Sequence, residues 1–144
     1  MAQVEKRAAS VPATFEWEYA PAPEARDIVQ IRERYGLYIG GSEVEPRTSE
    51  WFESISPSTE EPLFEVALAG KEDVGLAVDA ARSAFEDGWS ALAPSERAKY
   101  LFRLARLIQE RSRELAVAES LDGGKPIRES RDVDIPLAAA HFFY

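Results

Sequence analysis

The stretch ESLDGGKPIRES, residues 119–130, contains the residues whose types and spacing most invite a chemical interpretation. Gly123, Gly124 and Lys125 follow one another, and a lysine after a glycine ends the phosphate-binding loop G-x-x-x-x-G-K-[ST]. Here Lys125 is followed by Pro126 in place of Ser or Thr, and a helical pattern precedes the turn where that loop needs a strand. The sequence therefore predicts a structural turn that ends a helix, and no nucleotide-phosphate site.

Carboxylates and the single histidine are the other candidates for chemistry. Glu110 and Glu114 lie one helical turn apart, which suggests a pair for acid–base catalysis. Arg111 and Arg113 alternate with them, however, and such mixed charge is typical of a solvated helix face. His141 has no second His or Cys nearby in the sequence and indicates no metal site. The chain has no cysteine, so these residues supply no disulfide, thiolate metal ligand or cysteine nucleophile.

Composition restricts the class of protein. The 144 residues suit one domain with a sizeable core, and 17 Lys and Arg against 26 Asp and Glu give a net charge of −9. An acidic chain is repelled by phosphate backbones and anionic lipid, so we expect neither nucleic acid nor a membrane surface as a partner. No apolar run is long enough to span a bilayer, and MAQVEKRAAS lacks the apolar core of a secretory signal. The expected location is the cytoplasm.

Residues 36–67 are predicted to form the strands of the chain. LYIGGSEVE has the pattern of a hairpin whose turn uses Gly40 and Gly41, because glycine accepts the positive φ of tight hairpin turns. WFESI and LFEVAL follow as two more strands, separated by a loop that contains Pro57 and Pro62. A three-strand region of this kind precedes all the long helical patterns.

Apolar spacing predicts helices over residues 72–86, 94–119 and 127–144. The first two are expected to pack on each other through their apolar stripes. The stripe of the first helix consists of Val74, Ala77, Val78, Ala81 and Phe85, and that of the second of Leu101, Leu104, Ala105, Ile108 and Leu115. Pro136 lacks the N–H that an α-helix needs, so the third helix is expected in two pieces, with Asp134 as the cap of the second.

Residues 1–34 are interpreted as an N-terminal extension. Pro12, Pro21 and Pro23 interrupt this segment, whereas Phe15 and Trp17 are unusual in a freely disordered tail. Two alternatives remain open: an arm that docks on a protein surface with a helical turn near residues 24–32, or a floppy tail.

The order of elements, strands first and helices after, predicts an α+β segment. No βαβ alternation and no G-x-G-x-x-G motif are present, so a dinucleotide-binding fold cannot be built from these residues alone.

From about Tyr35 to Tyr144 the sequence resembles the N-terminal part of the NAD(P)-dependent aldehyde dehydrogenases. The resemblance rests on the combination of the glycine-turn hairpin, the loop SPSTE, the helix start in WSALAPSER, the motif ESLDGGKP and the segment DIPLAAAHFFY. The sequence departs from the family at Ser56 and Gly123, where the family usually has Asn. Neither change removes the match, although both affect hydrogen bonds within turns.

The resemblance implies that the chain is a fragment: the first strands and helices of an incomplete α/β, Rossmann-like cofactor domain. The complete enzyme would use NAD or NADP, form a homo-oligomer and oxidise an aldehyde to a carboxylic acid through a cysteine thioester. The catalytic cysteine, the glutamate base and the glycine-rich cofactor loop of the family all lie outside these residues, so no catalytic or cofactor-binding residue is assigned. We expect the chain alone to be inactive and to need the missing C-terminal part as its partner. The alternative is a non-catalytic interaction module that pairs with a full-length dehydrogenase.

Two minor roles are implied by the resemblance at particular positions. Backbone oxygens near Ser54 and Ile55, together with the side chain of Asp122, correspond to a monovalent cation site in many family members. The alternative is that Asp122 only caps its own turn, as aspartate commonly does. Leu137 corresponds to a residue of the substrate tunnel, for which the alternative is ordinary packing.

Overall fold

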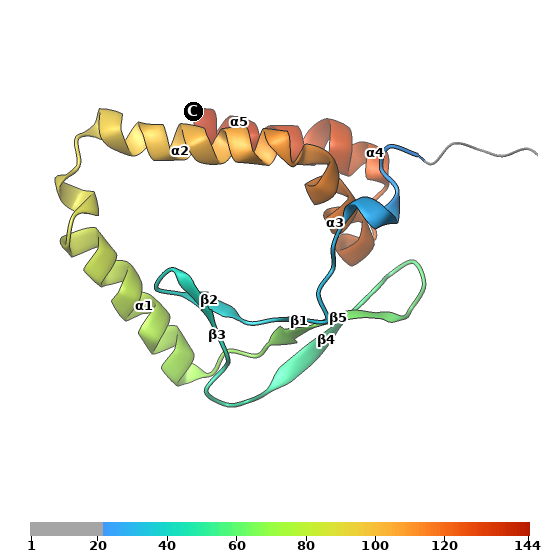
Figure 1. Cartoon of the computed structure of the whole chain (residues 1–144), viewed down its shortest axis with the longest axis horizontal. Coiled ribbons are helices and arrows are strands. Elements are labelled where there is room, and N and C mark those ends of the chain that lie inside the picture. Colours follow the sequence, from blue (N-terminus) through green and yellow to red (C-terminus); the bar gives the residue numbers. More distant parts are fainter. Residues whose placement is uncertain (1–21) are drawn as a thin grey trace, which may run out of the picture.

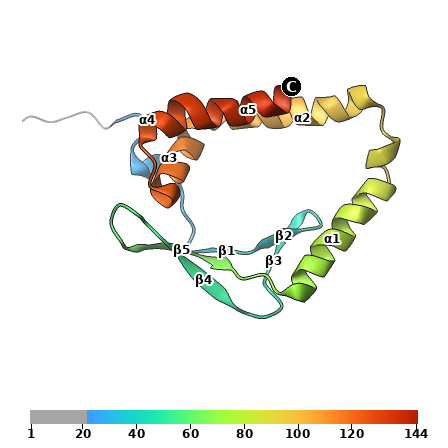
Figure 2. The same cartoon turned by 180° about the vertical axis from the view of Figure 1, so that it is seen from behind.

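The computed structural model describes residues 22–144, and its elements form an open ring (Figures 1 and 2). The strands are β1 (Arg34–Tyr35), β2 (Leu37–Ile39), β3 (Ser42–Val44), β4 (Trp51–Ile55) and β5 (Pro62–Ala67). The helices are α1 (Lys71–Glu86), α2 (Pro94–Glu110), α3 (Ser112–Gly123), α4 (Ile127–Glu129) and α5 (Ile135–Phe143). Two 3-10 turns, η1 (Arg26–Ile28) and η2 (Trp89–Ala91), and a π-helical turn, η3 (Ser130–Asp134), complete the described part. The strands form one side of the ring, and α2 and α5 run side by side along the opposite side.

The sheet has three strands in the order β1-β5-β4. β5 pairs antiparallel with β4, while the short β1 pairs with it in parallel, placing Tyr35 beside Val66. The strands predicted at WFESI and LFEVAL are confirmed as β4 and β5. The parallel pairing of β1 was not foreseen, because two residues carry no periodicity from which a strand can be recognised.

β2 and β3 form the predicted hairpin as a separate two-stranded sheet. Gly40 and Gly41 have φ values of 61° and 86°, the left-handed region that a two-residue hairpin turn needs. The hairpin contacts α1, which leads away from the strands toward the helical side of the ring.

The predicted long helix 94–119 is wrong in one respect: it is two helices. Arg111, at φ −102° and ψ 19°, leaves the helical conformation between α2 and α3. The helix predicted over 72–86 is confirmed as α1. The two apolar stripes do not pack on each other, however, because α1 contacts the hairpin and η2, whereas α2 packs along α5.

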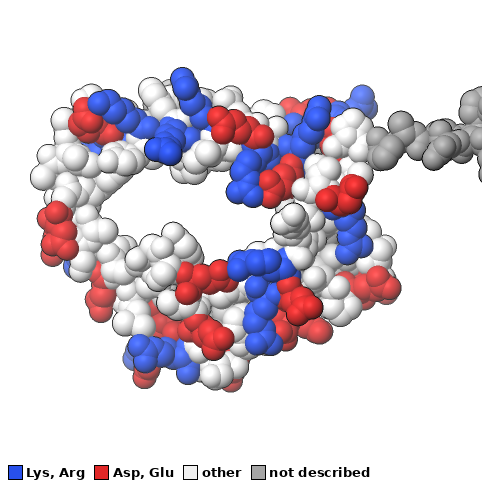
Figure 3. All heavy atoms as spheres, viewed as in Figure 1, with Lys and Arg blue, Asp and Glu red and all other residues white. Residues whose placement is uncertain are grey.

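The core consists of small side chains and lies mainly on the helical side of the ring. The buried apolar residues are Ala67, Ala105, Ala116, Val117 and Ala139. The expectation that Leu101 and Leu104 are buried is wrong, since they are 42% and 41% exposed. α2 packs along α5 and is covered on only part of its surface. Figure 3 shows a wide opening between the helical side of the ring and the strands.

The C-terminal helical run is continuous in direction but irregular in its hydrogen bonds. α4 leads into the π-helical turn η3, and Pro136 then occupies the second position of α5. The two-piece prediction is confirmed to the extent that the irregularity lies just before Pro136. Asp134 is not the cap that was predicted: it has helical dihedral angles and makes no capping hydrogen bond.

Residues 22–28 lie beside α3, and residues 29–33 lead from there to β1 (Figure 1). η1 contacts α3, and Glu24 lies 3.6 Å from the guanidinium of Arg131. The short turn at Arg26–Ile28 falls within the predicted helical turn near residues 24–32. Residues 1–21, with Phe15 and Trp17, lie outside the described residues, so the choice between arm and tail stays a prediction.

Candidate functional site

The turn after α3 is the structural feature that the sequence predicted. Gly124 has φ 68°, and its N–H donates to the carbonyl oxygen of Ser120 at 3.1 Å. The hydroxyl of Ser120 donates in turn to the carbonyl oxygen of Lys125 at 2.7 Å. A left-handed glycine with this pattern is a common way to end a helix. A side chain at Gly124 would collide with Pro57, so this turn is also packed against the loop after β4.

The ammonium group of Lys125 is engaged by carboxylates. Its Nζ donates to Oδ2 of Asp134 and lies 3.6 Å from Oε1 of Glu119. The hydrogen bond to Asp134 raises the pKa of Lys125 above its ordinary value. A lysine held in this way joins the end of α3 to η3, which is a structural role.

The structure brings together two of the residues assigned to a cation site. Oγ of Ser54, in β4, donates a hydrogen bond to Oδ1 of Asp122 at the end of α3, although the two residues are 68 positions apart. The contact joins the sheet to the helical side of the ring. In this contact the carboxylate of Asp122 binds a residue of the sheet, not a backbone N–H of its own turn.

A bulge interrupts the sheet at the same place. The pairing of β4 with β5 shifts between Ser54 and Ile55. A bulge locally disrupts the ladder of backbone hydrogen bonds and re-aims the groups beside it. Backbone oxygens next to one carboxylate are hard ligands with a small total charge, which fits a monovalent cation better than a divalent one. Within residues 22–144, no group of three or more His, Asp or Glu residues is placed to hold a metal ion.

An apolar cavity of about 540 Å³ lies beside Asp122. It separates the strands from α3, and Tyr35 and Phe64 meet in it edge to face at a centroid distance of 5.1 Å. Its other lining residues are Val29, Ile31, Leu115, Ala118, Glu119, Leu121 and Ile135. The carboxylate that binds Ser54 therefore lies at the edge of an apolar space.

Leu137 and His141 both lie on α5. Leu137 is 51% exposed and its helix packs along α2. The tunnel role that the resemblance implies for Leu137 stays a prediction. His141 is exposed near the end of the helix.

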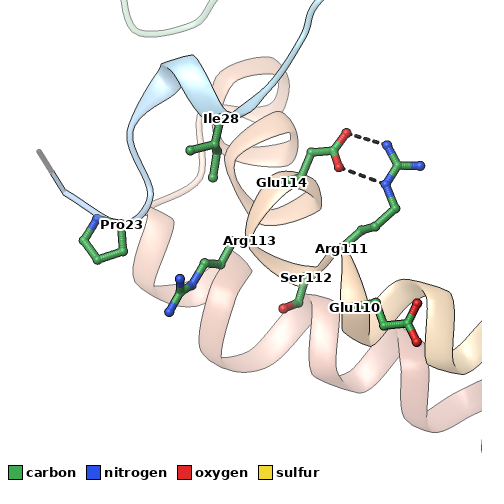
Figure 4. A pocket seen from close by; sticks show the side chains of 7 residues that line it. All are labelled: Pro23, Ile28, Glu110, Arg111, Ser112, Arg113 and Glu114. Carbon is green, nitrogen blue, oxygen red and sulfur yellow. Dashed lines mark hydrogen bonds and ion pairs between the residues drawn. The ribbon is translucent and has the colours of Figure 1, made fainter.

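The carboxylates of the α2–α3 junction form a charged groove and no acid–base pair. Arg111 donates through Nε to Glu114 at 2.8 Å and through a second nitrogen to the other oxygen (Figure 4). These bonds hold the pKa of Glu114 below its ordinary value of 4.5. A carboxylate so stabilised in its charged form is a weak base near neutral pH. The groove has a volume of about 450 Å³ and is also lined by Pro23, Ile28, Glu110, Ser112 and Arg113.

One contact and one buried hydroxyl of this region were missed in the sequence. The pairing of Lys125 with Asp134 joins residues nine positions apart across an irregular turn, a spacing that no helical pattern indicates. The hydroxyl of Ser130, in η3, is fully buried and has no hydrogen-bond partner among the described residues. The sequence signal for this irregular region was Pro136, because a proline inside a helical pattern indicates an irregular helix nearby.

Comparison with known proteins identifies the family. The model of the aldehyde dehydrogenase family matches residues 44–144. Acetaldehyde dehydrogenase 2 of Cupriavidus necator is 44% identical over 113 residues, which cover 78% of this chain and 22% of that protein. Aldehyde dehydrogenase B of Escherichia coli is 40% identical over 116 residues, covering 81% of this chain and 22% of that protein. The chain thus spans about a fifth of the length of these relatives.

Solved structures give the same result for the fold. The NAD+ complex of an aldehyde dehydrogenase from Bacillus cereus matches with a TM-score of 0.76 at 40% identity, covering 79% of this chain and 23% of that chain. An apo indole-3-acetaldehyde dehydrogenase matches with a TM-score of 0.76 at 39% identity, covering 82% of this chain and 27% of that chain. The predicted fold class, an incomplete α/β dehydrogenase domain, is confirmed. From its sequence and its fold, this chain belongs to the aldehyde dehydrogenase family as an N-terminal segment.

Proposed function

We propose that this chain provides the first strands and helices of the cofactor domain of an enzyme that oxidises an aldehyde to a carboxylic acid. The observation that supports the proposal most directly is the family match over residues 44–144, together with 44% identity to an acetaldehyde dehydrogenase. NAD or NADP accepts the hydride in this reaction. A structural neighbour is an NAD+ complex, which supports NAD. The complete protein is proposed to be a cytoplasmic homo-oligomer.

The chemistry of the reaction gives this chain a structural role and no catalytic residue. A thioester route needs a cysteine thiolate to attack the aldehyde carbon, and water then releases the carboxylic acid. The 144 residues contain no cysteine, so the thiolate must come from another segment. The described residues also have no helix long and apolar enough to cross a membrane. The contribution proposed for this chain is to position the segments that carry the thiolate and the cofactor.

The decisive assay measures reduced-cofactor absorbance with a panel of aldehydes and with NAD or NADP. We expect no turnover by the chain alone, and turnover when it is co-expressed with a complementary C-terminal segment that carries the cysteine. A complementary segment whose cysteine is changed to serine is the matched control and is expected to be inactive. Turnover by the chain alone would contradict the proposed division of roles.

Ser54, Ile55 and Asp122 are proposed to bind a monovalent cation in the same protein. The hydrogen bond between Ser54 and Asp122 and the bulge at Ile55 support this assignment. The thermal midpoint of the chain should be higher in potassium chloride than in choline chloride at equal ionic strength. Asp122→Asn should remove this difference, whereas Asp87→Asn, at the end of α1, should leave it unchanged. Equal midpoints in both salts for the unchanged chain would refute the cation site.

A second candidate function is that of an interaction module that pairs with a full-length dehydrogenase. It is favoured by the large exposed apolar side chains on the ring, among them Val74, Val78 and Phe85, since such patches usually mark contact surfaces. Binding of the chain to a full-length dehydrogenase, without turnover on co-expression with the complementary segment, would favour this module. Dye binding that disappears on co-expression with the complementary segment would favour the enzyme.

A further inference from the structure

The hydrogen bonds of the C-terminal helical run change their spacing at η3. The N–H of Ile135 donates to the carbonyl oxygen of Ser130, five residues earlier, where an α-helix would use the carbonyl four residues earlier. Regular α-helical spacing returns in α5. One turn of the run is thus one residue wider than its neighbours, and turns of this type often occur at functional sites.

Pro136 gives a physical reason for the wide turn. In an uninterrupted α-helix its ring would collide with the carbonyl of residue 132, and its missing N–H would leave that carbonyl without a partner. A wider turn just before the proline separates the ring from that carbonyl. η3 ends two residues before Pro136, which is where a wider turn relieves this clash.

An ion pair holds the end of the wide turn. Asp134 is the last residue of η3, and its carboxylate accepts a hydrogen bond from Lys125 in the turn after α3. Glu119 adds a second carboxylate 3.6 Å from the same ammonium. The backbone of Lys125 is held by the hydrogen bond from the hydroxyl of Ser120 to its carbonyl oxygen. The ion pair of Lys125 with Asp134 therefore connects η3 to the end of α3.

The width of this turn determines the rotation of everything that follows it. Removing one residue from a turn rotates the rest of the helix by about 100°. In the observed arrangement Ala139 is 1% exposed, while Leu137 is 51% exposed. Two positions on a helix are separated by about 200°, so these residues lie on opposite sides of α5. A rotation of α5 would therefore move both out of their present environments.

We propose that Pro136 and the Lys125–Asp134 ion pair are positioning residues that keep η3 in its five-residue form and so present Leu137 on the open side of α5. In one respect the inference rests on the proposed function and on the substrate-tunnel role that the resemblance implies for Leu137: in the active enzyme, the presented side of α5 would lie along the path of the aldehyde. The rotation itself is a property of the described chain.

Single introduced thiols measure the rotation directly, because the chain has no cysteine of its own. Leu137→Cys and Ala139→Cys are each labelled with a maleimide in the full 144-residue chain. We expect position 137 to react much faster than position 139. Adding Pro136→Ala should reduce the ratio of the two rates by about tenfold, since a buried thiol reacts only when its surroundings open. An unchanged ratio would overturn the proposal.

Controls separate rotation from unfolding. Ala116→Cys, fully buried in α3, should stay protected in the Pro136→Ala background, and the far-UV circular dichroism should keep its helical signal. Lys125→Met should lower the labelling ratio in the same direction, and Lys125→Arg, which keeps the ion pair, should restore it. If Lys125→Met and Lys125→Arg give the same labelling ratio, the Lys125–Asp134 ion pair does not hold η3 in its five-residue form.

Activity provides an independent measurement. In the pair with the complementary segment, Pro136→Ala should change KM among aldehydes of different size more than kcat. Absence of turnover by the unchanged pair would refute the proposed function and leave the labelling result standing. A normal labelling change with an unaltered KM would show that the presented side of α5 does not contact the aldehyde, which overturns that part of the inference.

Discussion

α1 and the α3–α5 cluster are held in the ring in different ways. The cluster of α3, α4, η3 and α5, with α2 alongside, contains Ala105, Ala116, Val117 and Ala139, four of the five apolar residues that are buried within residues 22–144. The only buried residue of α1 is Asp73, whose carboxylate accepts hydrogen bonds from the N–H groups of Arg47 and Gly70. One region is joined by packing, whereas the other is held by polar contacts at its start and buries no apolar side chain where it meets the hairpin and η2.

This difference shows that a hydrogen-bonded carboxylate can position a helix that buries no apolar side chain. Asp73 satisfies backbone donors at the start of α1 and ties the helix to the segment before β4, so the helix is located without burying its apolar stripe. Val74, Val78 and Phe85 stay more than half exposed. The packed cluster, in contrast, depends on the close fit of small residues, which any change of volume disturbs.

Removing the attachment of α1 should have the largest effect. Asp73→Ala leaves the N–H groups of Arg47 and Gly70 without their acceptor, at a cost of about 2–3 kcal/mol. We expect amide hydrogen exchange to accelerate along α1 while α3 and α5 keep their protection. Glu72→Ala, an exposed change in the same first turn, is the control and should cost only a few tenths of a kcal/mol. Equal acceleration in all helices would show that the two regions are one cooperative unit.

The same substitution in both regions should have unequal effects. Val117→Ala removes a side chain that is 4% exposed and should lower the free energy of unfolding by about 2 kcal/mol, including the cavity it leaves. Val78→Ala, at 53% exposure on α1, should change it by less than about 0.5 kcal/mol. Urea unfolding followed by circular dichroism gives both numbers. A similar loss at the two positions would remove the distinction between packed and attached regions.

Two serines of the cluster should respond in opposite directions. Ser120→Ala removes the hydrogen bond to the carbonyl oxygen of Lys125 and should cost about 1 kcal/mol. Ser130→Ala removes a buried hydroxyl without a partner among the described residues, so it should be neutral or slightly stabilising. Thermal midpoints compared side by side test this pair. A destabilising Ser130→Ala would indicate that its hydroxyl has a partner in solution.

Surface ion pairs should have the smallest effect and should depend on pH. Arg111 lowers the pKa of Glu114, and Arg32 lowers that of Glu43, so each pair stabilises the folded chain above the unfolded value of 4.5. This contribution is lost as the pH falls from there through the folded pKa values. Because all these groups are exposed, sodium chloride should largely remove the pH dependence. A pH dependence that persists at high salt would show that these surface ion pairs are not its source.

Local patterns in the sequence predicted the elements well, and the long-range contacts less well. The glycines of the β2–β3 hairpin and the left-handed Gly124 are identifiable because few other residues accept their dihedral angles. The break at Arg111 was missed because LIQERSREL keeps a helical charge pattern through the junction. The chain bends there because α3 runs in a different direction from α2, and no local pattern of residues indicates that direction.

The candidate site was predicted through the resemblance, and its geometry needed the structure. Neither the type nor the spacing of Ser54 and Asp122 indicates that they meet, since 68 residues separate them. Burial of Leu101 and Leu104 was predicted from periodicity alone, which identifies an apolar face but says nothing about what covers it. The neighbours of that face depend on residues far away along the chain.

The parallel pairing of β1 with β5 has a consequence for the order of folding. Tyr35 and Val66 become neighbours only after the 30 residues between them have formed a closed loop, and that closure costs chain entropy before any contact compensates for it. The β2–β3 hairpin closes locally and needs no such step. We therefore expect Tyr35→Ala to speed unfolding with little change in the refolding rate, while Gly41→Ala slows refolding. Chevron measurements that assign the rate-limiting step to β1 would reverse this order.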